Sequence, residues 1–133
     1  MRCVAKLLRV KLTRKYGLQI LETCKIGIGL ELPHAMSIVV HYNAILGKNC
    51  TLHQFVTIGG YGYGYGNAPI IGDNCFISTG VVIVGNVMIG NNVTIGANAV
   101  VTKNIPNNAT IGGVPAKVLH FNHPAKYIKN PVL

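Results

Sequence analysis

Acidic residues are scarce in this 133-residue chain. Only three Asp and Glu residues oppose twelve Lys and Arg residues, so the formal net charge at pH 7 is +9. A positive field of this size attracts anionic ligands, and a phosphate-rich small molecule suits it as well as nucleic acid does. Aromatic residues make up only 7% of the chain and alternate in one loop alone. Because no nucleic-acid-binding motif accompanies them, we expect no nucleic-acid partner.

Long uninterrupted apolar runs are also missing. Lys6 and Arg9 break the N-terminal stretch, so no segment reaches the length of the apolar core of a secretory signal peptide. We therefore expect a cytoplasmic protein.

Metal-ligand spacing is absent as well. The histidines share no short repeated spacing that would place them on one face: His34, His41, His53, His120 and His123. Three of the four cysteines fall on inward positions of the repeat described next, where a small apolar residue packs: Cys24, Cys50 and Cys75. They are predicted to be core thiols, and no metal site is predicted.

What the chain does contain is an aliphatic residue at every sixth position. These lead positions are Ile20, Ile26, Leu32, Val40, Leu46, Leu52, Ile58, Ile71, Ile77, Ile83, Ile89, Ile95 and Val101. Two residues before each lies a second apolar residue: Leu18, Cys24, Leu30, Ile38, Ala44, Cys50, Val56, Pro69, Cys75, Val81, Val87, Val93 and Ala99. Such a pattern is typical of a repeat architecture.

A six-residue period predicts a solenoid of short strands. Three strands would make a triangular coil of about eighteen residues, and successive coils would stack at about 4.8 Å. The lead residue and the residue two before it point inward because side chains alternate along a strand. Corners favour Gly and Asn, which lie outside the inward pair: Gly47, Gly72, Asn74, Gly85, Asn86, Gly90, Asn91, Asn92 and Gly96. We expect one parallel β-helix over residues 17–118, an N-terminal cap over 1–16 and a tail over 119–133.

The cap carries six of the twelve basic residues, with Val4, Leu7, Leu8 and Leu12 at helical spacing. It is predicted to be a cationic amphipathic helix. One interpretation is that this helix covers the first coil and shields its exposed edge. The other is contact with an anionic lipid surface or glycan.

The six-residue count slips first between Leu32 and Val40, where two extra residues form the segment PHAMS. His34 is thereby lifted out of the repeat at a corner of the coil. A neutral imidazole can take a hydroxyl proton near pH 7, so His34 is the best candidate for a general base. A purely structural corner histidine is the alternative.

The second slip, between Ile58 and Ile71, adds seven residues and predicts a protruding loop over residues 59–69, with the sequence GGYGYGYGNAP. Its alternating Tyr and Gly residues would suit a flat or sugar-like ligand or a neighbouring subunit. The alternative is an insertion without chemical consequence.

Several segments match a known family in order: GLQI, KIGIGLELPHAMSIVV, TIGG, ISTGVVIVGNVMIG, IGANAVVTKNIP and GGVPAKV. On these segments, residues 17–118 resemble the catalytic β-helix of the serine acetyltransferase family, including its relatives that acetylate surface polysaccharides. Many acyltransferases share hexapeptide repeats, so the specific part is the histidine bulge followed by IVV, TIGG and GVPAKV. The resemblance implies an all-β, left-handed parallel β-helix that assembles as a homotrimer.

The resemblance also implies acetyl transfer from acetyl-CoA, as co-substrate, to a hydroxyl. His34 matches the family's catalytic histidine. Gly60, Thr79 and Ala97 match positions that line the cofactor groove between two subunits. Two cations could meet the CoA phosphates or be solvated cap residues: Lys103 and Lys117.

This sequence departs from the family at the positions that hold charge. Gln19 replaces the aspartate that orients the catalytic histidine, so Glu31 or another acid would have to substitute for full activity. Pro33 replaces an acidic residue that grips the amine of serine. Asn67 and Ala68 replace the basic residue and histidine that meet the serine carboxylate.

These departures favour a sugar hydroxyl as acceptor, for example on a surface-polysaccharide precursor, with three loop aromatics against the sugar ring: Tyr61, Tyr63 and Tyr65. Serine is the alternative acceptor. A catalytically weak scaffold or binding subunit is the alternative from another functional class.

Overall fold

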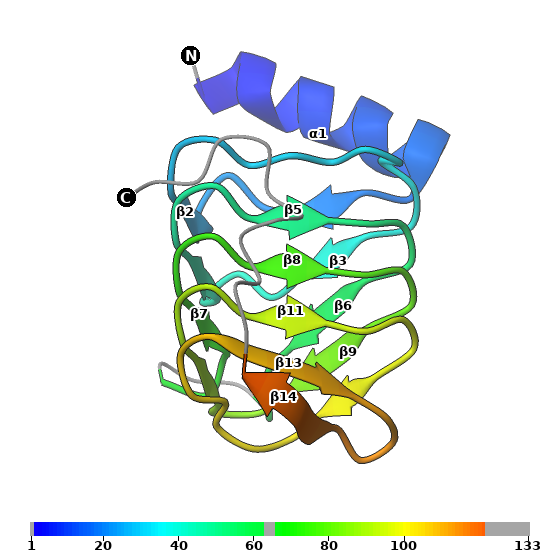
Figure 1. Ribbon diagram of the computed structural model, residues 1–133. Helices are drawn as coiled ribbons and strands as arrows, with labels where there is room; N and C mark the ends of the chain where they lie inside the picture. The colour runs from blue at the N-terminus through cyan, green and yellow to red at the C-terminus, as the bar shows by residue number, and fades with distance from the viewer. Residues whose placement is uncertain (1, 63–65, 122–133) are drawn as a thin grey trace.

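The stacked coils that the six-residue period predicts are present in the computed structural model, which describes residues 2–62 and 66–121. Short strands line three flat sides of a triangular solenoid (Figure 1). Tyr63 and Tyr65, which the sequence predicts to contact a sugar, and the part of the predicted tail beyond residue 121 lie outside the described residues.

Each side of the solenoid is one sheet. Sheet A holds β1 (Gln19–Ile20), β3 (Val39–Val40), β6 (Thr57–Gly59), β9 (Val82–Val84) and β12 (Val100–Val101). Sheet B holds β2 (Lys25–Ile26), β4 (Ile45–Leu46), β7 (Ile70–Ile71) and β10 (Met88–Ile89). Sheet C holds β5 (Thr51–Leu52), β8 (Phe76–Ile77), β11 (Thr94–Ile95), β13 (Ala109–Gly112) and β14 (Lys117–Phe121).

The strands of one coil pair in parallel with those of the next, in register with the repeat. Leu46 pairs with Ile71, and Ile71 pairs with Ile89. The inward positions form a continuous core, in which Ile38, Val56 and Ile58 are fully buried. The sequence therefore identified the core correctly, because the six-residue period determines which side chains point inward.

The cysteines take inward positions as predicted. Cys50 and Cys75 are buried and free, whereas Cys24, in the first coil, is only half-buried. Burial raises the pKa of the Cys24 thiol. In the described residues, no three His, Cys, Asp or Glu side chains are grouped so that they could hold a metal ion.

Glycine serves two different purposes at the corners. Gly85 has a φ of 96°, as expected for a left-handed turn. Gly72 does not have a positive φ; instead, a Cβ atom there would lie 2.8 Å from the backbone carbonyl of Gly90 in the next coil. At Gly72 it is the close stacking of coils that excludes a side chain.

Both ends of the solenoid are covered. Helix α1 (Arg2–Tyr16) crosses the first coil, where Leu12 packs against the core (Figure 1). At the other end, β14 runs antiparallel to β13 and pairs with its free edge. The predicted end of the repeat at residue 118 falls within β14 (Lys117–Phe121). Because β14 runs back along β13, it protects the last edge from strand addition.

The described residues include no helix long and apolar enough to cross a membrane.

Candidate active site

The first slip in the count forms a corner bulge between sheet C and sheet A. Glu31 bridges to Thr51 in sheet C, and the chain enters sheet A only at β3. Within the bulge, the Met36 amide donates a 2.8 Å hydrogen bond to the His34 carbonyl. The His34 side chain is exposed, so its imidazole is accessible to a ligand.

This bulge and the corresponding corners of the following coils stack into a column, which we call the His34 corner: residues 33–37, 53–55, 78–80 and 96–98. Backbone hydrogen bonds link its levels: the amides of Phe55, Gly80 and Asn98 donate to the carbonyls of Met36, Gln54 and Thr79. Two of the predicted cofactor positions, Thr79 and Ala97, therefore lie along the same edge as His34.

Gln19 lies next to the bulge on the first strand of sheet A. The backbone amide of Gln19 donates a 2.8 Å hydrogen bond to the Ile38 carbonyl, and the residue pairs with Val39 of β3. The Gln19 side chain is exposed, and no hydrogen bond joins it to His34 in the described part of the chain. Its proposed orienting role stays a prediction.

His53 is a second histidine at this corner that the sequence reasoning did not select. Its ring centroid lies 5.9 Å from that of His34 and 5.1 Å from the Phe76 ring. Burial, and secondarily the nearby His34, lower the pKa of His53 from its usual value of 6.5, which favours the neutral imidazole. Aligning Glu31 with Thr51 would have placed His53 level with the bulge.

The protruding loop begins at the next corner, between sheets A and B, which we call the loop corner: residues 41–43, 60–62, 66–69 and 85–86. The Tyr61 amide donates a 3.0 Å hydrogen bond to the Asn67 carbonyl and closes the loop at its base. A side chain on Gly60 would collide with the Asn67 carbonyl and would lie in tight contact with the His41 ring. Gly60 therefore lies at a different corner of its own chain from Thr79 and Ala97.

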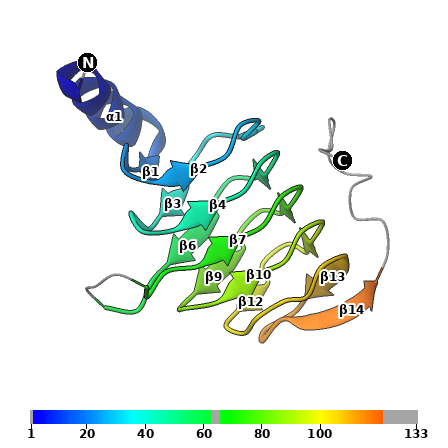
Figure 2. The ribbon, with the colours of Figure 1, turned by 90° about the vertical axis from the view of Figure 1, so that its left-hand side faces the viewer.

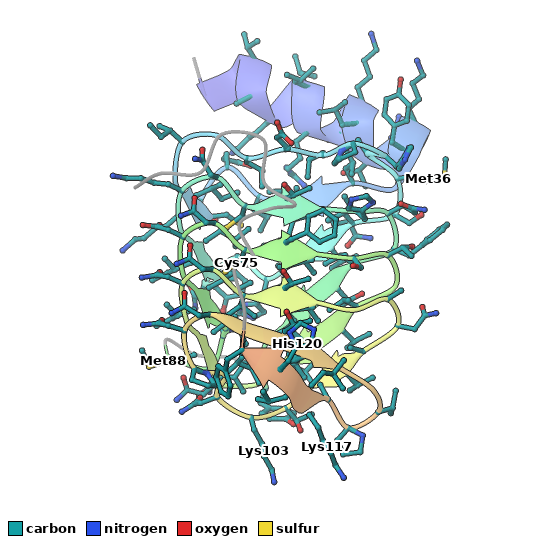
Figure 3. The ribbon with its side chains drawn as sticks, in the orientation of Figure 1. Met36, Cys75, Met88, Lys103, Lys117 and His120 are labelled. Carbon is teal, nitrogen blue, oxygen red and sulfur yellow. The ribbon has the colours of Figure 1, made fainter. Side chains whose placement is uncertain are left out.

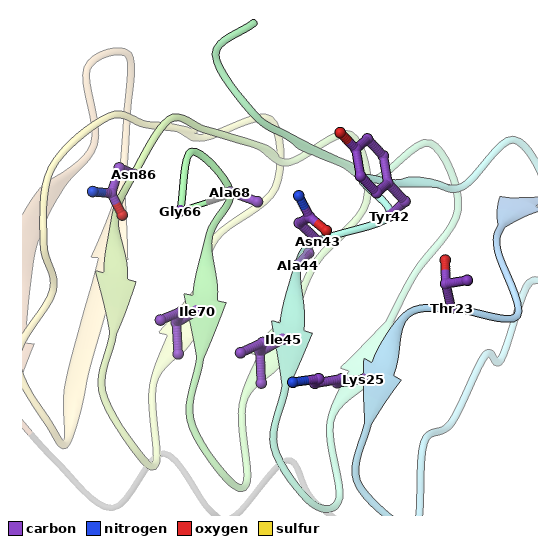
Figure 4. A pocket seen from close by; sticks show the side chains of 10 residues that line it. All are labelled: Thr23, Lys25, Tyr42, Asn43, Ala44, Ile45, Gly66, Ala68, Ile70 and Asn86. Atoms are coloured by element: carbon purple, nitrogen blue, oxygen red, sulfur yellow. The ribbon is translucent and has the colours of Figure 1, made fainter. Parts of the chain in front are cut away.

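A cavity of about 250 Å³ opens at the loop corner (Figure 4). Ala68, a predicted substrate position, is buried and lines it. The other lining residues are one cation, an aromatic ring, hydroxyl and amide side chains, and a largely apolar floor: Lys25, Tyr42, Thr23, Asn43, Asn86, Ala44, Ile45, Gly66 and Ile70. Tyr42 stacks on the His41 ring at 4.4 Å, which fixes one wall.

The remaining predicted site residues lie in three places. Pro33 is exposed beside His34, and Tyr61 is exposed at the loop base. Lys103 and Lys117 extend from the end of the solenoid opposite α1 (Figure 3).

Known proteins resemble this chain in both sequence and structure. Residues 68–103 match the bacterial transferase hexapeptide model (six repeats). Serine acetyltransferase 1, chloroplastic, of Arabidopsis thaliana is 40% identical over 132 residues, covering 98% of this chain and 42% of its own length. A serine acetyltransferase of Staphylococcus aureus is 39% identical over 104 residues, covering 77% of this chain and 49% of its own.

Solved structures agree. A crystal structure of Neisseria gonorrhoeae serine acetyltransferase superposes with a TM-score of 0.84 at 35% identity, covering 96% of this chain and 51% of that one. A serine acetyltransferase in complex with CoA gives 0.78 at 32% identity, covering 88% and 48%. This chain thus spans about half the length of its relatives. The prediction of a left-handed β-helix is confirmed, and the chain belongs to the hexapeptide-repeat transferases, with a β-helix of the serine acetyltransferase type.

Proposed function

We propose that this protein transfers an acetyl group from acetyl-CoA to a hydroxyl, with His34 as the general base. The observation that carries the proposal is the exposed imidazole of His34 in the corner bulge, on the edge shared with Thr79 and Ala97. The solved complex of a relative with CoA supports acetyl-CoA as the donor.

The chemistry requires one proton acceptor close to the acceptor hydroxyl. The neutral imidazole of His34 takes the hydroxyl proton while the oxygen attacks the thioester carbonyl. When the tetrahedral intermediate collapses, the carbon–sulfur bond breaks and the imidazolium returns the proton to the leaving sulfur. The products are an acetyl ester and the free thiol of CoA.

Serine is the acceptor that the comparisons favour. The relatives are named serine acetyltransferases, and two of the solved structures are complexes with serine. This is the alternative of the sequence analysis, where the residues alone favoured a sugar.

A sugar hydroxyl is kept as the second candidate because of the loop corner. None of the ten described residues that line the cavity is acidic, so nothing there would pair with the ammonium group of serine. Pro33, Asn67 and Ala68 carry no charge either. Tyr42 and the Asn43 and Asn86 amides suit a ring bearing hydroxyls.

We also propose that the active form is a homotrimer. His34 and the cavity lie at different corners of one coil, so a single chain keeps them apart. A neighbouring copy could bring its loop corner against the His34 corner and complete the site.

Thiol release from acetyl-CoA tests the proposal, measured with serine, simple sugars and nucleotide sugars as acceptors. The His34→Ala variant should lower turnover by about 10² to 10⁴-fold, the range for losing a general base. His120→Ala, on exposed β14, is the matched control and should be unaffected. Retention of most activity by His34→Ala would remove His34 from the mechanism, and failure of every acceptor would favour a scaffold role.

A further inference from the structure

Helix α1 combines charge of a single sign, positive, with exposed apolar side chains. It holds six of the twelve basic residues of the chain and no acidic residue. A helix that only covers a core would be expected to show apolar residues on its inner side alone.

The inner side of α1 is firmly attached to the first coil. Leu12 packs against the core, and the Thr13 hydroxyl donates a 2.6 Å hydrogen bond to the Leu18 carbonyl. Arg9 pairs with Glu22 at 3.3 Å. These contacts fix which side of the helix faces outward.

The outer side carries large apolar residues between cations. Val4 is 69% exposed and Leu7 is 71% exposed. Lys11 and Arg14 follow Leu7 at spacings of four and seven residues, so all four side chains lie on one stripe of the helix. Leu7 and Lys11 also line a shallow hollow on this face.

The placement of α1 leaves this stripe accessible. Figures 1 and 2 show the helix at the extreme end of the solenoid, with the stacked coils all on its other side. A flat surface could therefore approach the outer side of α1 along its whole length without meeting the β-helix.

We propose that the outer side of α1 binds the surface of an anionic membrane. Val4 and Leu7 would enter the boundary between headgroups and acyl chains, while Lys11 and Arg14 contact lipid phosphates through their long side chains. A soluble polyanion would engage the cations but would offer nothing to the apolar residues. A lipid surface matches both, and the proposal is independent of acetyl transfer.

Co-sedimentation of the full chain with vesicles tests this proposal. Vesicles of phosphatidylcholine with 30% phosphatidylglycerol should bind the protein at least about tenfold more tightly than phosphatidylcholine alone, because each cation adds to the attraction. The double variant Lys11→Gln/Arg14→Gln should lose about tenfold or more of this binding. Val4→Gln/Leu7→Gln should lose a comparable amount, because each buried methylene contributes to insertion.

Matched controls lie elsewhere on the surface. Met88→Gln and Lys48→Gln alter an exposed apolar residue in β10 and an exposed cation after β4, both outside the first coil, and they should bind vesicles normally. Heparin provides the soluble polyanion; its binding should fall in the charge variant and stay unchanged in the apolar variant. Circular dichroism verifies that every variant is folded.

Three results would overturn the proposal. The unaltered protein could fail to sediment with anionic vesicles. The apolar variant could bind vesicles as well as the unaltered protein, which would indicate a plain polyanion site. Sedimentation velocity could show an assembly that depends on Val4 and Leu7, which would make this face an interface between copies of the chain.

Discussion

At the scale of single residues, the group beside His34 decides how well the imidazole can work as a base. Taking a proton turns the imidazole into a cation, which a neighbouring carboxylate would stabilise. Gln19 offers an amide at the position where the family resemblance places an aspartate, so it can hydrogen-bond the ring without neutralising its charge.

Gln19→Asp should therefore shift the pH–rate profile. A carboxylate beside the ring would stabilise the imidazolium, so more base is needed to keep His34 neutral and the acidic limb of the profile should move to higher pH. The measurement is kcat/KM for acetyl transfer from pH 5 to 9. Gln19→Asn is the control, because asparagine has the length of aspartate without its charge. This variant should leave the acidic limb in place. If the Asp variant also leaves it in place, position 19 is out of reach of His34.

His53 should make folding stability depend on pH. Its pKa is lower in the folded protein than the usual value of 6.5, so the unfolded chain binds the proton more readily. Stability is therefore lost as the pH falls through about 6.5. His53→Gln should flatten this part of the curve of melting temperature against pH. His120→Gln, on exposed β14, should follow the unaltered protein, and equal slopes in all three proteins would contradict the prediction.

The sequence revealed one of these two histidines because of how the repeat works. His34 interrupts the six-residue count, which made it conspicuous. His53 keeps the count, and only the pairing of Glu31 with Thr51 shows that the two rings meet across neighbouring coils. Which residues meet across neighbouring coils depends on the number of residues in the whole intervening coil, bulge included, so the sequence around His53 alone does not show the contact.

At the scale of the elements, the corner between sheets B and C is stabilised by a column of asparagines. Asn74, Asn92 and Asn108 have φ values of 55°, 56° and 61°. The Asn74 side-chain amide donates to the Asn92 Oδ1 atom at 3.1 Å, and Asn92 donates in the same way to Asn108. Asparagine thus satisfies both the left-handed backbone and the vertical hydrogen bonding.

Substitutions of Asn92 should separate these two contributions. Asn92→Gly tolerates the positive φ but removes both side-chain hydrogen bonds, so it should lower the free energy of unfolding by about 1 to 2 kcal/mol. Asn92→Ala adds backbone strain and should cost about 1 kcal/mol more. Urea denaturation measures both values. Asn86→Ala, at an exposed position of the loop corner, is the control, and equal costs for Gly and Ala at position 92 would mean that the backbone is not strained there.

The strands were predictable because the six-residue period applies to all of them. The features that were not predictable lie where this period stops. The inward residues follow from the alternation of side chains. The antiparallel return of β14 did not follow, because GGVPAKV carries no sign of strand direction. The cavity at the loop corner was also missed, since it joins Lys25 of β2, in the first coil, to Asn86, which lies between β9 and β10.

At the scale of the whole molecule, the proposed site is divided between two corners. The His34 corner holds the base and two of the positions expected to line the donor groove, Thr79 and Ala97. The loop corner holds the cavity, with Lys25 as the cation in its lining. A single solenoid cannot fold one corner onto another, because the stacked sheets between them are rigidly paired.

Sedimentation should therefore give a mass of about 43 kDa for a homotrimer, three times the 14.2 kDa of one chain. Two variants that should each be inactive alone should also complement each other in mixed trimers. His34→Ala lacks the base, whereas Lys25→Glu alters only the cavity. In trimers reassembled from an equal mixture, a site that takes one corner from each of two neighbours is intact in about a quarter of cases. Acetyltransferase activity should recover to about that fraction of the unaltered enzyme. Mixing without subunit exchange serves as the control and should restore nothing. A mixture that stays inactive after reassembly, or a monomer that turns over, would place the whole site within one chain.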